Sequence, residues 1–181
     1  MPIGKDALLI GAQHIPATFE LQTANFVPAA GDFVPGWGYF VTKASTIPAS
    51  ATSIDELFLV TGKCLITLIV GESTSVVATT TSLTLRTKAN TKSIAAITDI
   101  VGDALGALYI VTGDPDDGLN GDATGATTGP DTAQCKTGFH APILMNDETI
   151  EMLVQANGTG QIKCDLCYIP LEASAVITSV A

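Results

Sequence analysis

The apolar residues of this sequence occur in short runs that are rich in β-branched side chains and are broken by Gly, Pro, Asn and Asp. Apolar residues spaced three and four apart, as an amphipathic helix requires, are almost absent. Short β-branched runs bounded by turn residues are typical of strands, and threonine, abundant throughout, favours the same pleated surfaces. The pattern therefore predicts an all-β domain.

The runs predict ten strands within one domain over residues 17–181, preceded by an extended N-terminal arm over residues 1–16. The length of 181 residues suits a single domain. The expected strands are Ala17–Phe26, Gly38–Thr42, Glu56–Thr61, Cys64–Gly71, Ser82–Thr87, Leu105–Thr112, Phe139–Met145, Thr149–Gln155, Gln161–Ile169 and Ala175–Val180.

Three short connections have the composition of tight hairpin turns: Val60–Cys64, Met145–Glu148 and Asn157–Gly160. In the first, Gly62 can supply a positive φ. Hairpins join antiparallel neighbours, so these connections predict an antiparallel sandwich. The run CLITLIV within Cys64–Gly71 is apolar at every position, which predicts a strand covered on both faces.

The sequence does not decide the structure of two segments. Ile94–Gly106 fits either a strand followed by a loop or a short helix, because Asp99 and Asp103 lie four apart while two glycines oppose a long helix. Gly113–Thr132 is a long loop by composition. Its oxygen donors make it a weak calcium candidate, although the spacing fails the EF-hand pattern. These donors are Asp114, Asp116, Asp117, Asn120 and Asp122.

Composition narrows the classes of partner. The net charge is −10 and Arg86 is the only arginine, so we expect no binding to nucleic acid or to anionic membranes. No segment is apolar enough for a signal peptide or a membrane span, which predicts a soluble protein that is made in the cytoplasm with reduced thiols and is not exported by the general secretory route. An apolar fraction of 46% with only 14% charged residues favours burial of surface in a homo-oligomer or partner.

The stretch GQIKCDLCYIPL carries Cys164 and Cys167 in a Cys-x-x-Cys spacing. If the stretch is a strand, the two thiols point to opposite faces with Cα atoms roughly 10 Å apart. A disulfide needs Cα atoms within about 7 Å, and a zinc knuckle needs a turn. We therefore expect buried, inert thiols. Cys64, Cys135, His14 and His140 show no metal-binding spacing, and no cofactor is predicted.

Catalytic signatures are missing from the sequence, so no catalytic residue is predicted. Glu148 and Glu151 could form a carboxylate pair, but they flank an expected hairpin and are expected to stay solvated. The aromatic residues of the PGWGYF stretch, Trp37, Tyr39 and Phe40, are the candidate interface anchors.

Three stretches together resemble a known class of proteins. They are TGKCLITLIVGE (Thr61–Glu72) with the following LTLRTKAN, then DIVGDALGALYIVTGD (Asp99–Asp114), and finally GTGQIKCDLCYIPLEASAVITSVA (Gly158–Ala181). A strand after a glycine turn that closes with Tyr-x-Pro-Leu and a short Ala/Val-rich strand resembles tailed-phage virion structural proteins, in particular capsid decoration (cement) proteins. The resemblance covers the chain from Thr61 onward.

The resemblance implies a jelly-roll-like subunit that sits on the outer surface of a phage capsid and bridges subunits of the major capsid protein. It also implies a homo-oligomer, for which a trimer is favoured and a dimer is possible. The arm over residues 1–16 would then pair with a neighbour. The alternatives are a tail or spike subunit and, more distantly, a β-sandwich or cupin-like binding module or enzyme. A cupin would need histidines that converge on a metal, and no His-x-His occurs.

Overall fold

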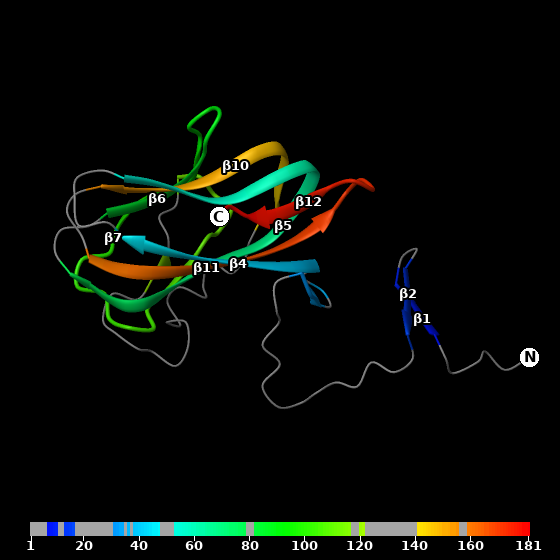
Figure 1. Ribbon diagram of the computed structural model, residues 1–181, viewed down its shortest axis with the longest axis horizontal. Coiled ribbons are helices and arrows are strands. Elements are labelled where there is room, and N and C mark those ends of the chain that lie inside the picture. Colours follow the sequence, from blue (N-terminus) through cyan, green and yellow to red (C-terminus); the bar gives the residue numbers. More distant parts are fainter. Residues whose placement is uncertain are drawn as a thin grey trace, which may run out of the picture.

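The computed structural model of the chain (Figure 1) describes residues 7–10, 13–16, 31–34, 36, 38–47, 53–78, 82–116, 120–121, 141–155 and 159–181. The described residues form strands and no helix. The strands are β1 (Ala7–Ile10), β2 (Gln13–Pro16), β3 (Phe33–Val34), β4 (Gly38–Ile47), β5 (Ser53–Ala78), β6 (Ser82–Thr87), β7 (Ser93–Asp99), β8 (Leu108–Ile110), β9 (Asn120–Gly121), β10 (Ile143–Gln155), β11 (Thr159–Pro170) and β12 (Val176–Ser179).

Ten of these strands form one antiparallel sheet, seven of them in the order β3-β4-β11-β5-β10-β6-β7. The other three lie off this order: β8 and β12 pair with β5, and β9 pairs with β8. The prediction of an antiparallel all-β fold is therefore confirmed. β1 and β2 pair only with each other among the described strands. The jelly-roll topology and the donated N-terminal arm stay predictions.

The 26-residue strand β5 connects the two layers of the fold. Its first part, Ser53–Ile66, pairs with β10, and its second part, Cys64–Ala78, pairs with β11. Figure 1 shows β5 and β10 curving together as they cross the molecule. Because the two parts of β5 have different neighbours, the sheet folds back on itself and encloses a core in the manner of a sandwich.

The predicted hairpins at Val60–Cys64 and Met145–Glu148 are wrong, because both segments lie inside continuous strands. Gly62 has a positive φ of 68°, as expected, but it bends β5 instead of reversing it. Asp147, with a φ of 45°, marks a register shift in β10, and its Oδ1 accepts a hydrogen bond from Gly62 N at 2.7 Å. Gly62 and Asp147, which are residue types typical of tight turns, thus lie side by side at an irregularity in the pairing of β5 with β10.

The third predicted hairpin, Asn157–Gly160, is also wrong, because β5 lies between β10 and β11 in the sheet. β10 and β11, which follow each other in the sequence, are therefore not neighbours in the sheet. Ile94–Gly106 contains most of β7 followed by a loop with positive φ at Gly102 and Gly106, so the helical alternative is wrong. The predicted strands at Ser82–Thr87, Gln161–Ile169 and Ala175–Val180 correspond to β6, β11 and β12. Ala17–Phe26 lies outside the described residues.

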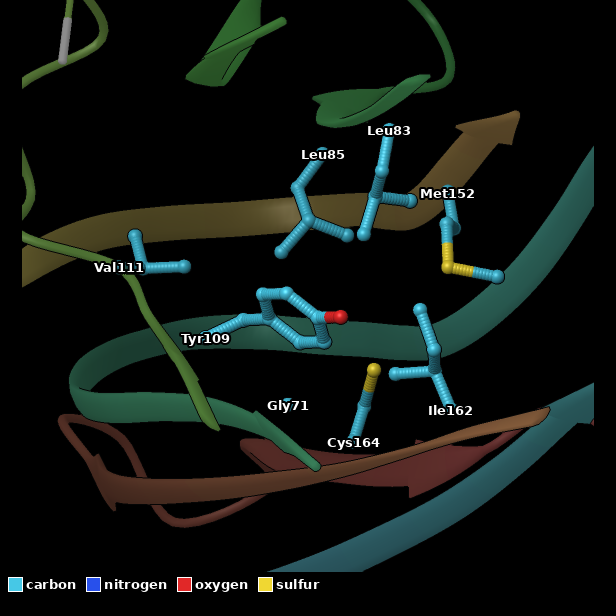
Figure 2. Close-up of a pocket in the computed structure, with 8 residues that line it drawn as sticks. All are labelled: Gly71, Leu83, Leu85, Tyr109, Val111, Met152, Ile162 and Cys164. Atoms are coloured by element: carbon cyan, nitrogen blue, oxygen red, sulfur yellow. The ribbon is translucent and has the colours of Figure 1, made fainter. Parts of the chain in front are cut away.

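Figure 2 shows the centre of the core, where the Tyr109 ring of β8 lies between leucines of β6 and the β11 side chains Ile162 and Cys164. The space that these side chains leave is about 10 Å³, enough for one water molecule at most. The Tyr109 hydroxyl donates a hydrogen bond to Asp103 Oδ2 at 2.7 Å, so the one polar atom of this ring is satisfied. This cavity is therefore part of a packed core and is too small for a substrate.

Candidate interaction surface

An open groove lies at the end of the molecule where β4 begins and β11 ends. We call it the aromatic groove; its volume is about 670 Å³. The turn between β11 and β12 forms its other wall. Its lining residues come from two distant parts of the sequence: Gly31, Tyr39, Tyr168, Pro170, Leu171, Glu172, Ala173, Ala175 and Val176.

Two aromatic rings line the aromatic groove, and a third packs against one of them. The register places Tyr39 of β4 opposite Tyr168 of β11, with ring centroids 5.8 Å apart. Phe33 of β3 meets Tyr39 edge to face, with centroids 5.5 Å apart and planes at 72°. The Tyr168 hydroxyl accepts a hydrogen bond from the Ile177 backbone, and burial raises the pKa of Tyr168. The rings are thus held in place by packing and by β12.

Two glycines allow the walls to approach this closely. A Cβ at Gly38, where φ is +99°, would lie 2.0 Å from the carbonyl oxygen of Tyr168. A Cβ at Gly62 would lie 2.5 Å from Glu172 Oε1 and 3.1 Å from Ala175 Cα. Only glycine accommodates both a positive φ and backbone at this distance. Both positions therefore shape the groove although neither lines it.

The turn over residues 171–175 is hydrogen-bonded to β5 beside Gly62. Leu171 N donates to the Lys63 carbonyl oxygen at 2.9 Å, and Lys63 N donates to Glu172 Oε1 at 3.0 Å. Ala175 N closes the turn by donating to the Glu172 carbonyl oxygen at 3.1 Å. The Glu172 carboxylate is therefore hydrogen-bonded to the backbone, while Leu171 and Ala173 of the turn are exposed to solvent and Ala175 is buried.

The rim of the aromatic groove is apolar and exposed. Among the residues that line it, Leu171 is 49% exposed and Val176 is 40% exposed. Large apolar side chains gathered around a concave surface are typical of protein-binding sites, since a monomer gains nothing by exposing them. The groove holds one charged side chain, Glu172, and its chemistry suits an apolar segment of a protein.

The structure places the predicted interface anchors in different environments. Tyr39 lies in the aromatic groove, half-buried. Phe40 is only 8% exposed and lies opposite Cys167 of β11, so it has little surface to offer a partner. Trp37 lies outside the described residues. Sequence analysis missed Leu171, which follows Pro170 at the end of β11, and Val176, which begins β12.

The acidic loop is described only in part. Asp114 Oδ1 accepts a hydrogen bond from Asp116 N at 3.0 Å, and both residues are exposed. Asp117 and Asp122 lie outside the described residues, and for Asn120, in β9, only the backbone is described. The calcium hypothesis stays a prediction. Within the described ranges, no three His, Cys, Asp or Glu residues are grouped so that they could hold a metal ion.

The expectation that Glu148 and Glu151 stay solvated is wrong for Glu151, which is 3% exposed. The register of β10 with β6 places it opposite Arg86, whose Nε lies 2.5 Å from Glu151 Oε1. Glu148 Oε1 accepts hydrogen bonds from Ala89 N at 3.1 Å and Thr149 N at 2.8 Å. Both carboxylates therefore have structural partners.

The Cys164–Cys167 segment is a strand, as predicted. Cys164 belongs to the hydrophobic core, whereas Cys167 faces Phe40 outside that cluster. Both thiols and Cys64 are buried and are not in disulfides. Burial raises the pKa of Cys164 to about 12 and also raises the pKa of Cys64 and of Cys167. Thiolate is the reactive form, so these three cysteines are chemically quiet.

These thiols predict a loss of stability in alkaline solution. Above pH 9 an unfolded Cys164 loses its proton, while the folded one keeps it up to about pH 12. The unfolded state then binds fewer protons, so stability falls as pH rises. Cys164 alone accounts for about 1.4 kcal/mol per pH unit in this window. Urea unfolding at pH 7 to 12 measures the effect. A midpoint that stays constant above pH 9 would contradict it, and alkylation mapped by mass spectrometry should leave native Cys164 unlabelled.

Comparison with known proteins identifies no relative: no protein family, no curated protein and no solved structure matches the chain. None of the described residues belongs to a helix with the length and apolar character needed to span a membrane.

Proposed function

We propose that this chain is a non-enzymatic structural protein of a phage virion that decorates the outer capsid surface and stabilises the shell by bridging subunits of the major capsid protein. The aromatic groove is the observation that carries a binding role. It combines a concave shape, two aromatic rings that pack against each other, and exposed apolar residues in its lining. Interfaces gain most of their affinity from buried aromatic anchors of this kind.

The remaining features of the chain agree with this role. The cavity beside Tyr109 in the described part of the core is only about 10 Å³, which agrees with a closely packed scaffold that has no substrate site there. A net charge of −10 keeps it from binding loose nucleic acid during particle assembly. The assignment to a capsid rests on the resemblance of the Thr61–Glu72, Asp99–Asp114 and Gly158–Ala181 stretches to decoration proteins. Assembly as a trimer is part of the same hypothesis.

The copy number in purified particles tests the proposal. Quantitative mass spectrometry of virions should find this chain in numbers comparable to the major capsid protein. A few copies per particle would instead support the tail or spike alternative. Complete absence from particles would overturn the virion proposal, and metal analysis of the purified protein would then test the cupin-like alternative.

Changes in the groove should weaken attachment to particles that lack the protein. Leu171→Asp places a charge on the apolar rim, which removes about 1.5 kcal/mol or more of apolar burial and should lower the affinity at least about tenfold. Ile54→Asp is the matched control, since Ile54 is 53% exposed and lies in the first part of β5, away from the groove lining. Co-sedimentation with the particles measures both. Equal binding by the two variants would show that the groove is not the contact.

A further inference from the structure

The two strands that carry the tyrosines of the aromatic groove have no free edge at those residues. At Tyr39, β4 pairs with β11 on one side and with β3 on the other. At Tyr168, β11 pairs with β4 on one side and with β5 on the other, where Ile66 lies opposite. A segment that binds against these rings therefore cannot add a strand to the sheet there. It has to bind through packing on the rings and through hydrogen bonds to side chains.

The hydrogen-bonding groups of the groove favour a partner that brings acceptors. Tyr39 lines the groove half-buried, and its hydroxyl forms no hydrogen bond with a described residue, so its proton is available to a carbonyl oxygen of a partner. The acceptor side chain of the lining is Glu172, and the walls are otherwise Pro, Leu, Ala and Val side chains. Peptide N–H groups placed against those apolar walls would be buried without acceptors, which is costly.

A proline-rich segment has the complementary backbone. Proline carries no N–H, and a polyproline II helix makes no internal hydrogen bonds, so its carbonyl oxygens remain free to accept. An α-helix also hides its N–H groups, but its carbonyl oxygens are used within the helix and would leave the Tyr39 hydroxyl without an acceptor. Of these two conformations, polyproline II therefore satisfies the groove better.

The rings are preorganised for packing against proline. The centroids of Tyr39 and Tyr168 lie 5.8 Å apart with their planes tilted by 37°, and Phe33 packs edge to face on Tyr39. Aromatic rings that line a groove are the surfaces on which proline-rich segments dock. Because the rings are already fixed and a polyproline II segment is itself stiff, binding immobilises little on either side.

Charge indicates one further feature of the partner segment. Glu172 is the charged side chain of the lining and is exposed. Its Oε1 accepts the Lys63 N–H, and its carboxylate forms no ion pair with a described residue. The net charge of −10 also attracts cations to the chain as a whole. A Lys or Arg beside the prolines would therefore be favoured at this end of the groove.

We propose that the aromatic groove binds a proline-rich segment of the partner protein in the polyproline II conformation, with proline rings against Tyr39 and Tyr168 and a Lys or Arg of that segment beside Glu172. The inference rests on the proposed function, because it names the chemistry of the segment by which the major capsid protein occupies the same groove.

Fluorescence anisotropy of labelled synthetic peptides, titrated with the full chain, tests the proposal. The first peptide is one lysine followed by six prolines, and it should bind saturably. A peptide with serines in place of the prolines should bind at least about tenfold more weakly, and one with glutamate in place of the lysine about fivefold more weakly. A helical peptide of leucine and lysine probes the alternative conformation and should bind more weakly than the first.

Two conservative variants test the named contacts. Tyr39→Phe keeps the ring and removes the hydroxyl, so it should weaken binding of the lysine–proline peptide about fivefold. Glu172→Gln keeps an oxygen that can accept the Lys63 N–H, and it should abolish the preference for the lysine peptide over the glutamate peptide. Ile54→Asp is the control outside the groove lining and should bind like the wild type. Thermal melting checks that each variant is folded.

Absence of saturable binding by the lysine–proline peptide at millimolar concentration would overturn the proposal. Equal binding of the serine peptide, tighter binding of the helical peptide, or an unchanged affinity in Tyr39→Phe would overturn it as well. The proposed function fails separately. If Leu171→Asp weakens attachment to particles while no proline peptide binds, the virion role stands and this inference falls. If the proline peptide binds and the chain is absent from particles, the inference stands and the virion role falls.

Discussion

Replacing Gly38 with alanine is expected to lower the free energy of unfolding by about 3 kcal/mol or more. Gly38 begins β4 with φ at +99°, and an added Cβ would lie 2.0 Å from the carbonyl oxygen of Tyr168 and 2.6 Å from its carbonyl carbon. The positive φ costs an alanine about 1–2 kcal/mol, and overpacking against fixed backbone costs about 1–3 kcal/mol more. Urea unfolding of Gly38→Ala and the wild type measures the difference.

Gly102→Ala is the control that separates these two costs. Gly102 has a φ of +79°, and a Cβ there meets nothing within 4 Å. The free energy of unfolding of Gly102→Ala should therefore fall only by the cost of the backbone conformation, about 1 kcal/mol. If the two variants lose equal stability, the contact between Gly38 and Tyr168 is not as close as the structure shows. Since Tyr168 lines the aromatic groove, the proposed function predicts that Gly38→Ala also weakens attachment to particles in the fraction that remains folded.

The sequence predicts those strands whose pattern is local. β11 is an example: Ile162, Cys164 and Leu166 alternate with polar residues, and the alternation alone places the two thiols of the Cys-x-x-Cys on different faces. β6 is followed by a turn over residues 88–90, and its predicted and observed limits agree. In such strands, the pattern of side chains within the strand and the residues that flank it predict the same strand limits.

The long bent strands could not be predicted in this way. Gly62 and Asp147 have the residue types of tight turns, and the sequence does not show that they lie beside each other in neighbouring strands. A glycine with positive φ reverses a strand only when the flanking residues pair with each other. Here Val60 and Lys63 pair with Glu148 and Asn146 of β10 instead, so the strand bends and continues. The outcome depends on a contact between residues 85 positions apart.

The aromatic groove is non-local for the same reason. Tyr39 was singled out because it lies in a Gly-rich aromatic stretch, but its neighbours Tyr168 and Val176 come from the other end of the chain. Their proximity follows from the pairing of β4 with β11 and from the turn fastened to Lys63. Exposure of Leu171 and Val176 cannot be read from their apolar character, which by itself predicts burial.

Arg86→Met is the second substitution with a large expected effect, a loss of about 3–5 kcal/mol of stability. Arg86 lies in β6, and its Nε is 2.5 Å from Glu151 Oε1 in β10. The Glu151 side chain is 4% exposed, whereas that of Arg86 is 21% exposed. Methionine keeps much of the apolar stem but leaves the Glu151 carboxylate buried without its cation, and an uncompensated buried charge is the costly outcome. In a chain of this size the melting temperature should fall by about 6 °C or more.

The paired variant Arg86→Met with Glu151→Met tests this reason. Removing both charges eliminates the buried carboxylate, so the double variant should be more stable than Arg86→Met alone although it carries one more substitution. Lys88→Met is the surface control, because Lys88 pairs with Glu56 where both side chains are solvent-exposed, and its melting temperature should stay close to that of the wild type. If Arg86→Met is as mild as Lys88→Met, water reaches Glu151 and the pair is not buried in solution. A double variant no more stable than Arg86→Met would instead mean that the Arg86 stem, packed across β6, contributes the stability through its contacts and not through its charge.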